Sequence, residues 1–208
     1  MEEKKIKVEL TAPAGSWESL SAALRAGADS IYFGIGRLNM RSRASTDFTV
    51  KDMEKISKLC RKGHARAYLA LNTVMYDSDI SEMKELCDAA KSAGISAVIA
   101  GDISAIQYAS SIGMPVHVSV QANVSNMEAA RFFAKFADVI VLARELDLGQ
   151  IALICKSIQE EQIRGPSGEL LRIELFAHGA LCVSISGKCY MSLAAYNMDS
   201  HNCQRIVK

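Results

Sequence analysis

Ala93-Gly-Ile-Ser-Ala-Val-Ile99 joins the end of a helical pattern to a short apolar run through a single glycine. The same order of helix end, small turn and apolar run recurs in Ala26-Gly-Ala-Asp-Ser-Ile-Tyr32 and in Phe136-Ala-Asp-Val-Ile-Val141. Apolar runs this short and continuous are typical of parallel strands that helices cover on both faces. The repeat therefore predicts an α/β fold with a parallel sheet.

The pattern extends over most of the chain. Segments with the character of strands alternate with helical segments, and they fall at residues 8–12, 30–34, 67–71, 97–100, 116–120, 139–142 and 171–176. Seven such strands in one row predict a TIM-like (β/α)8 barrel rather than a doubly wound sheet. The first strand is not followed by Gly-x-Gly-x-x-Gly, which weighs against a Rossmann fold.

The chain is short for a closed barrel. A full barrel needs an eighth strand and typically has about 250 residues, whereas this chain has 208. We therefore expect an incomplete barrel of about seven strands, either a truncated barrel or a fragment of a longer protein. The alternative is that the N-terminal segment or a partner closes the gap. We expect residues 1–208 to form one domain, with a cysteine-bearing C-terminal segment at 177–208.

Charge and hydropathy limit the classes of protein to consider. The formal net charge is +1, so binding to nucleic acid or to an anionic membrane must rest on a local patch. No apolar run reaches the roughly 18 residues that span a bilayer. The N-terminus lacks the apolar stretch of a secretory signal. We therefore expect a soluble, cytoplasmic protein without a membrane span.

Functional groups of such a barrel lie at the C-terminal ends of its strands. Three arginines follow the second strand and could clamp a carboxylate or phosphate of a substrate, or form solvated charge pairs. They are Arg37, Arg41 and Arg43. Polar groups at other strand ends could line a pocket or make strand-end hydrogen bonds. They are the catalytic candidates Asn72, Gln121, Glu145 and His178, the substrate-binding candidate Arg144, and Asn123.

Two histidines and three cysteines have plain structural interpretations. His117 could point into the barrel or into the helix layer, and we favour a hydrogen-bonded core histidine. His64 lies at a helix end and is expected at the surface. Cys60, Cys87 and Cys155 lie in helix-like segments, and in a reducing compartment we expect them to be small buried hydrophobic residues.

The C-terminal cysteines differ, because Cys182, Cys189 and Cys203 gather in one segment of Gly, Ser and polar residues. Cys182 and Cys189 are separated by six residues, and Gly179 and Gly187 give the backbone freedom to turn both thiols toward one centre. Thiolates bind soft metals, principally zinc or iron–sulfur clusters. The pattern favours a metal site with Cys203 as a candidate third ligand, over a reactive thiol or structural cysteines.

The segment from Glu174 to Ser192 resembles the signature of peptidase family U32. That signature is Glu-x-Phe-x-x-Gly-(Ser/Ala)-aliphatic-Cys-x4-Gly-x-Cys-x-aliphatic-Ser, and every defined position is met. Three further stretches are similar to the family: Glu9-Leu-x-Ala-Pro-Ala-Gly15, the run from Ala26 to Gly34, and Leu142-Ala-Arg-Glu-Leu146. The resemblance covers nearly the whole chain.

The resemblance implies a function that the residues alone do not. The family was named for a collagenase-like protease, but other members support oxygen-independent or prephenate-dependent hydroxylation of the tRNA wobble uridine, a ribosomal RNA cytidine or a ubiquinone precursor. It implies a [4Fe-4S] cluster on four cysteines, with Cys182 and Cys189 as the first two ligands and Cys203 as the third. It also implies prephenate as a candidate cosubstrate, tRNA or other RNA as a partner, and a related U32 subunit as a further candidate partner.

Three functions follow, and the favoured one is prephenate-dependent 5-hydroxylation of the tRNA wobble uridine. The second is a collagenase-like peptidase. The chain lacks the Gly-x-Ser-x-Gly and His-Glu-x-x-His motifs, so a nucleophile pair would have to be Cys182 with His178. The third is a non-catalytic fragment or scaffold that pairs with a related subunit.

Overall fold

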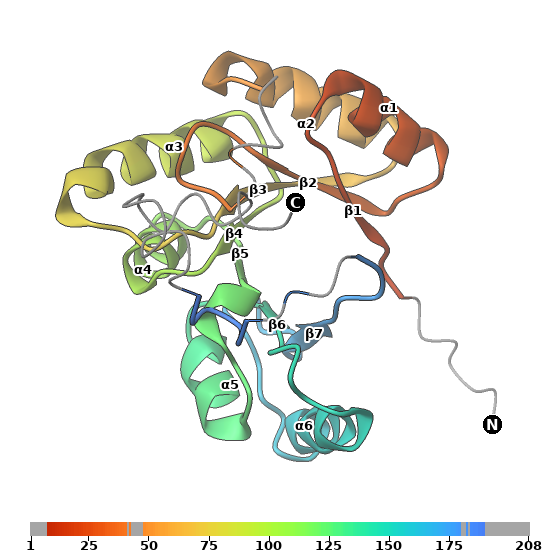
Figure 1. The fold of residues 1–208 in the computed structure, drawn as a ribbon, viewed down its shortest axis with the longest axis vertical. Helices are drawn as coiled ribbons and strands as arrows, with labels where there is room; N and C mark the ends of the chain where they lie inside the picture. The colour runs from red at the N-terminus through yellow and green to blue at the C-terminus, as the bar shows by residue number, and fades with distance from the viewer. Residues whose placement is uncertain (1–7, 41, 43–47, 180–181, 183, 190–208) are drawn as a thin grey trace.

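A computed structural model describes residues 8–40, 42, 48–179, 182 and 184–189. Its seven strands form one parallel sheet in chain order, from β1 to β7. They are β1 (Thr11–Pro13), β2 (Ser30–Gly34), β3 (Arg66–Leu71), β4 (Ala97–Ala100), β5 (Val116–Val118), β6 (Val139–Val141) and β7 (Arg172–Glu174). Among the described residues β1 and β7 are the two end strands and do not pair with each other. The predicted incomplete α/β barrel is confirmed (Figure 1).

Helices follow the strands and cover the outside of the curled sheet (Figure 1). They are α1 (Trp17–Arg25), α2 (Met53–Lys62), α3 (Ile80–Ser92), α4 (Ile103–Ser111), α5 (Met127–Ala134) and α6 (Leu148–Glu160). Short 3-10 turns occur at η1 (Val50–Asp52), η2 (Asp77–Asp79) and η3 (Val120–Ala122). Side-chain oxygens of Ser16, Asp102, Asn126 and Asp147 accept N–H groups at the starts of α1, α4, α5 and α6, which satisfies donors that a helix leaves open.

The glycines of the repeat end their helices as the sequence predicts. Gly94, which follows α3, has a φ of +70°, and Gly27, which follows α1, has a φ of +84°. These left-handed conformations favour glycine and turn the chain back toward the sheet. The fifth strand is shorter than predicted, because the Ser119 hydroxyl accepts the Gln121 N–H and the chain turns into η3.

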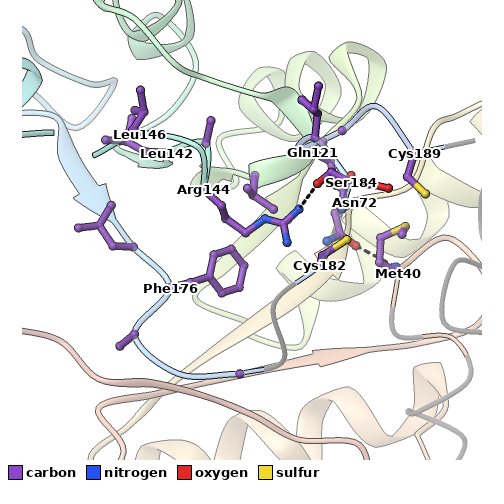
Figure 2. Close-up of a pocket in the computed structure, with 18 of the residues that line it drawn as sticks. Met40, Asn72, Gln121, Leu142, Arg144, Leu146, Phe176, Cys182, Ser184 and Cys189 are labelled. Carbon is purple, nitrogen blue, oxygen red and sulfur yellow. Dashed lines mark hydrogen bonds between the residues drawn. The ribbon is translucent and has the colours of Figure 1, made fainter. Parts of the chain in front are cut away.

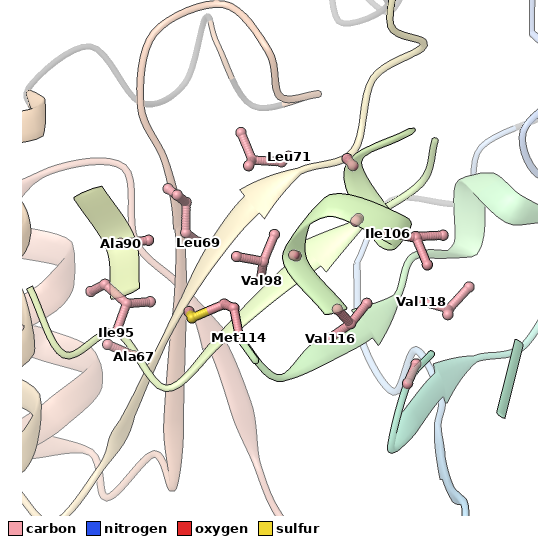
Figure 3. Close-up of a cluster of buried hydrophobic side chains, with 14 of the residues drawn as sticks. Ala67, Leu69, Leu71, Ala90, Ile95, Val98, Ile106, Met114, Val116 and Val118 are labelled. Atoms are coloured by element: carbon pink, nitrogen blue, oxygen red, sulfur yellow. The ribbon is translucent and has the colours of Figure 1, made fainter. Parts of the chain in front are cut away.

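The main core lies between the sheet and the helices. Figure 3 shows part of it, where Leu69, Val98 and Val116 from neighbouring strands meet Ile106 of α4 and Met114. A smaller cluster fills the inside of the half-barrel, formed by Tyr68, Ala97 and Ile99 with Tyr32 against them. The strands are therefore covered on both faces, as their apolar runs predict.

His117 belongs to the inside of the half-barrel. Its ring lies 4.5 Å from the Tyr68 ring, and the residue is 5% exposed. Its Nδ1 atom has no hydrogen-bond partner in the described structure, and it lies 3.6 Å from the carboxylate oxygen Glu174 Oε2. The expected burial is thus confirmed, whereas the expected hydrogen bond at Nδ1 is not made. His64 is exposed, as predicted.

Cys60 and Cys87 are fully buried in the main core. Burial raises the pKa of the Cys60 thiol to about 11 and that of Cys87 to about 12. Both thiols stay protonated at neutral pH, which fits small apolar core residues. Cys155 is only half-buried, so the expectation of a buried residue is not met there. None of the helices in the described residues is long and apolar enough to cross a bilayer.

Candidate functional site

A pocket of about 600 Å³ opens at the C-terminal ends of the strands (Figure 2). Residues that follow β3, β4, β5, β6 and β7 line it, together with Met40 from the β2–α2 connection. This is the edge at which barrel enzymes carry their functional groups. Four of the catalytic and binding candidates named from the sequence, Asn72, Gln121, Arg144 and His178, meet in this pocket.

One wall of the pocket is apolar. It consists of Leu142, Leu146, Leu148, Ile151, Leu175 and Phe176. Leu148 is 81% exposed and Phe176 is 60% exposed. Large apolar side chains left open beside polar groups are typical of a binding surface. Sequence reasoning did not name this wall, although Phe176 occupies a defined position of the U32 signature.

The two predicted metal ligands also line the pocket. Cys182 is exposed and Cys189 is half-buried, and both thiols are free of disulfides. Two soft thiol donors on one wall fit half of a four-thiolate cluster site. Cys203 lies outside the described residues. The metal-site assignment therefore stays a prediction.

The loop between the two cysteines is fixed to the end of β6. The Arg144 guanidinium donates from Nη2 to the Ser184 carbonyl oxygen at 3.2 Å and from Nε to the Ser186 hydroxyl at 3.3 Å. The Ser186 N–H donates to Glu145 Oε1 at 2.7 Å. Partial burial alone would raise the pKa of Glu145, but the hydrogen bonds from Ser186 and from its own backbone outweigh it and hold that pKa below its usual value. Glu145, named as a catalytic candidate, thus holds the cysteine loop in place.

Gly187 brings the same loop against the turn after β5. Its φ is +71°, and a Cβ atom at this position would lie 2.0 Å from the Gln121 carbonyl oxygen. No side chain fits at such a distance. The glycine between the two cysteines of the signature therefore has a physical reason: only glycine lets the loop approach η3 this closely.

The polar groups of the pocket fall into two kinds. Asn72 and Asp102 are already hydrogen-bonded, since Asn72 Oδ1 accepts the Met40 N–H at 3.0 Å and Asp102 accepts the N–H groups of Ser104 and Met75. Within the described part of the chain, the hydroxyl of buried Thr73 has no hydrogen-bond partner, and Gln121 is a further polar residue of the pocket lining. The sequence analysis did not name Thr73, although it directly follows the strand-end candidate Asn72. The Thr73 hydroxyl is therefore a candidate to bind a ligand, together with the Gln121 amide.

Arg37 does not reach the pocket. Its guanidinium pairs with Asp79 at 2.6 Å and with Glu82 at 2.9 Å. The hydrogen bond to Asp79 raises the pKa of Arg37. Of the two interpretations of the arginine loop, the structure shows the charge pairs at this residue. Arg41 and Arg43 lie outside the described residues, and their role in substrate binding stays a prediction, as does that of Arg144.

Comparison with known proteins places the chain in a family. The model of "Peptidase family U32" matches residues 15–208. The chain belongs to peptidase family U32. It is 52% identical over 202 residues to a "Collagenase" of Porphyromonas gingivalis. The matched region covers 96% of this chain and 49% of that protein.

Two U32 relatives have names from RNA modification. The chain is 30% identical to "tRNA hydroxylation protein P" of Helicobacter pylori, over 89% of this chain and 42% of that protein. It is also 30% identical to "23S rRNA 5-hydroxycytidine C2501 synthase" of Escherichia coli, over 90% of this chain and 27% of that protein. The chain therefore spans from about a quarter to about half of these relatives' length.

A solved U32 peptidase structure has the same fold. It matches with a TM-score of 0.59 and 12% sequence identity, covering 88% of this chain and 97% of the solved chain. At that identity the match supports the architecture alone. It agrees with the seven-stranded sheet described above.

Proposed function

We propose that this U32 chain is the cluster-bearing part of an enzyme that hydroxylates a pyrimidine base in RNA, with the tRNA wobble uridine as substrate and prephenate as cosubstrate. The observation that carries the proposal is the pocket itself. It joins two thiols that form no disulfide, a buried hydroxyl without a partner, a side-chain amide and an exposed aromatic ring, namely those of Cys182, Cys189, Thr73, Gln121 and Phe176.

Each part of the pocket suits such a substrate. A pyrimidine base presents hydrogen-bond donors and acceptors along one edge and a flat face. The Gln121 amide offers both a donor and an acceptor, and the Phe176 ring offers a stacking surface. An enzyme that modifies a base must take it out of its stack into a pocket of this kind. The names of the RNA-modifying relatives support the same substrate class.

The thiols would hold the cofactor. Cys182 and Cys189 would be two ligands of a [4Fe-4S] cluster, and Cys203 is the candidate for the third. Such a cluster supplies one-electron redox chemistry. The chain's own contribution is to fix the ligand loop: Arg144 and Glu145 hold Ser184 and Ser186, which lie between the two cysteines.

A peptidase is the second candidate, favoured by the name of the 52%-identical relative. The pocket gives it less support. Cys182 and His178 both line the pocket, but no hydrogen bond joins them among the described residues. A thiol nucleophile is activated by a base within hydrogen-bond reach. The third possibility, a non-catalytic scaffold, gives no role to the thiols and polar side chains that line the pocket.

Purification without oxygen tests the proposal. We expect a brown protein whose visible absorption is accompanied by iron and sulfide, and which converts uridine to 5-hydroxyuridine in an unmodified tRNA when prephenate is added. Cys182→Ser and Cys189→Ser should remove iron and activity together. The matched control is Cys155→Ser, a half-buried thiol on α6 outside the pocket, which should keep both.

The same preparations decide between the candidates. A protein without iron that cleaves gelatin, and loses this cleavage in Cys182→Ser, would establish the peptidase function and contradict the hydroxylase function. Protein without iron, hydroxylation or cleavage would leave the scaffold as the function of this chain.

A further inference from the structure

Helix α2 and the turn before it carry a dense group of basic residues on their solvent side. Between Lys51 and Lys62 the sequence has five basic and two acidic residues, a local excess of three positive charges in a chain whose net charge is +1. Four exposed lysines, here called the lysine face, line a shallow hollow of about 380 Å³ with Glu54 and Leu59. They are Lys51, Lys55, Lys58 and Lys62.

The neighbouring acids, Asp52 and Glu54, offset two of the five positive charges and leave the excess of three. Asp52 accepts hydrogen bonds from the N–H and the hydroxyl of Thr49, at 2.9 and 2.7 Å. Glu54 pairs with Lys58 at 2.5 Å. Lys51 and Lys62 have no carboxylate partner in the described part of the chain. Lys55 Nζ lies 4.0 Å from the centre of the Trp17 ring, a contact that orients the ammonium without cancelling its charge.

The lysine face begins at the edge of the barrel where the pocket opens. In a βα unit the helix starts beside the C-terminal end of the preceding strand. Here β2 ends at Gly34, the chain passes Met40 in the pocket wall, and η1 starts at Val50. Figure 1 shows α2 next to α1 on the outside of the sheet. The start of the lysine face and the pocket therefore lie at the same end of the sheet.

We propose that the lysine face binds the phosphate backbone of the RNA whose target nucleotide enters the pocket. This inference rests on the proposed function and adds where the rest of the substrate lies. Lysines act on phosphates as point charges, so they position an RNA without reading its sequence. Several lysines along one helix can therefore contact successive phosphates of an RNA strand.

A membrane surface fits the same helix less well. Helices that lie in a bilayer interface insert an exposed apolar face. The apolar residues Met53, Ile56 and Cys60 of α2 are 0% exposed, because they pack into the main core. Leu59, 36% exposed, is the largest apolar side chain in the hollow. The charge of the lysine face is therefore available to a polyanion in solution.

A pair of variants with equal charge tests the proposal. The first replaces the lysine face as K51Q/K55Q/K58Q/K62Q, and glutamine keeps the helix because its helix propensity is close to that of lysine. The control is K84Q/K91Q/K135Q/K156Q, which removes four exposed lysines from other surfaces. Both are prepared without oxygen as the full chain, and binding to an unmodified tRNA transcript is measured at several salt concentrations.

We expect the lysine-face variant to lose affinity and salt dependence together. Each lysine that pairs with a phosphate contributes about 0.7 to 0.9 to the slope of log K against log salt, so four contacts make the slope shallower by about 3. The control should bind like the wild type. An equal loss of tRNA affinity in both variants would contradict the proposed role of the lysine face. So would a lysine-face variant that binds phosphatidylserine vesicles more weakly while its tRNA binding is unchanged.

The two proposals fail in different ways. If the wild type binds tRNA and the lysine-face variant keeps the wild-type slope, the lysine face is wrong and the proposed function stands. If cluster-loaded wild type does not bind tRNA at all, the proposed substrate is wrong, and the lysine face is overturned with it.

Discussion

Gly187 shows how much of the pocket depends on a single backbone position. Its φ of +71° would strain any other residue, and its approach to the Gln121 carbonyl oxygen leaves no room for a Cβ atom. Gly168 offers a matched comparison, because it has a φ of +83° but nothing within 4 Å of its Cβ position. The two glycines therefore separate backbone strain from a steric clash.

Gly168→Ala should lower the free energy of unfolding by about 1 kcal/mol, the usual cost of a positive φ for a non-glycine residue. Gly187→Ala adds the clash, and relief of the clash requires the loop to move away from η3. We expect it to reduce the iron content of protein purified without oxygen, while Gly168→Ala leaves iron unchanged. Thermal unfolding and iron analysis measure both effects. Equal iron content in the two variants contradicts this account of Gly187.

At the scale of elements, the connection between the end of β6 and the cysteine loop is held by an ionised carboxylate. The Ser186 N–H donates to Glu145, and this hydrogen bond contributes to the lowered pKa of that carboxyl. A depressed folded-state pKa gives stability that is present above the unfolded pKa of about 4.3 and is lost as pH falls through the folded value. The connection should therefore hold at neutral pH and weaken only in acid.

The amide proton of Ser186 reports this titration. Its NMR chemical shift should move with a midpoint below about 4.3, the ordinary pKa of a glutamate. In Glu145→Gln the change of the Ser186 chemical shift with pH should be absent, because the amide oxygen still accepts the hydrogen bond but does not titrate. The N–H of Thr49, which donates to Asp52 at 2.9 Å, serves as an internal reference that should titrate in both proteins, because this hydrogen bond helps to lower the pKa of Asp52. A Ser186 midpoint at or above 4.3 contradicts the assignment.

Elements and strand ends could be predicted from the sequence, because both depend on local patterns. The run Ala93–Ile99 identified β4 through one glycine and one apolar stretch, and the strand-end rule placed Asn72 and Gln121 at the pocket. The roles within the site could not be predicted. Glu145 acts on Ser186, about 40 residues further along the chain. Such contacts arise only when the fold brings distant segments together.

At the scale of the whole molecule, the open sheet needs contacts that tie its ends together. Glu9, just before β1, lies at the inside of the half-barrel. It accepts a hydrogen bond from the Tyr68 hydroxyl of β3 at 2.6 Å, pairs with Arg66 at 2.6 Å and lies 3.7 Å from Arg172 of β7. The carboxylate thus connects both end strands of the described sheet to its middle. Burial, together with the hydrogen bond to Glu9, raises the pKa of Tyr68, so its hydroxyl stays a donor.

Glu9→Gln should therefore weaken the barrel more than the loss of a surface charge does. The Glu9 side chain is 22% exposed and its partner Tyr68 is 1% exposed, so the hydrogen bond is largely shielded from water, whereas Arg66 is half exposed and its ion pair is screened. We expect a loss of about 1 kcal/mol in the free energy of unfolding, because the glutamine oxygen still accepts the Tyr68 hydroxyl but a hydrogen bond to a neutral oxygen is weaker than one to a carboxylate, and the pairing with Arg66 is lost. Glu54→Gln is the control, because Glu54 and its partner Lys58 are both exposed and solvent screens the pair, so its loss should hardly change the free energy of unfolding. Urea unfolding gives both values, and Tyr68→Phe, which removes the hydrogen bond altogether, should cost at least as much as Glu9→Gln. If the two glutamate variants unfold alike, the end strands are held by apolar packing alone, and the charged groups inside the half-barrel contribute nothing to closing it.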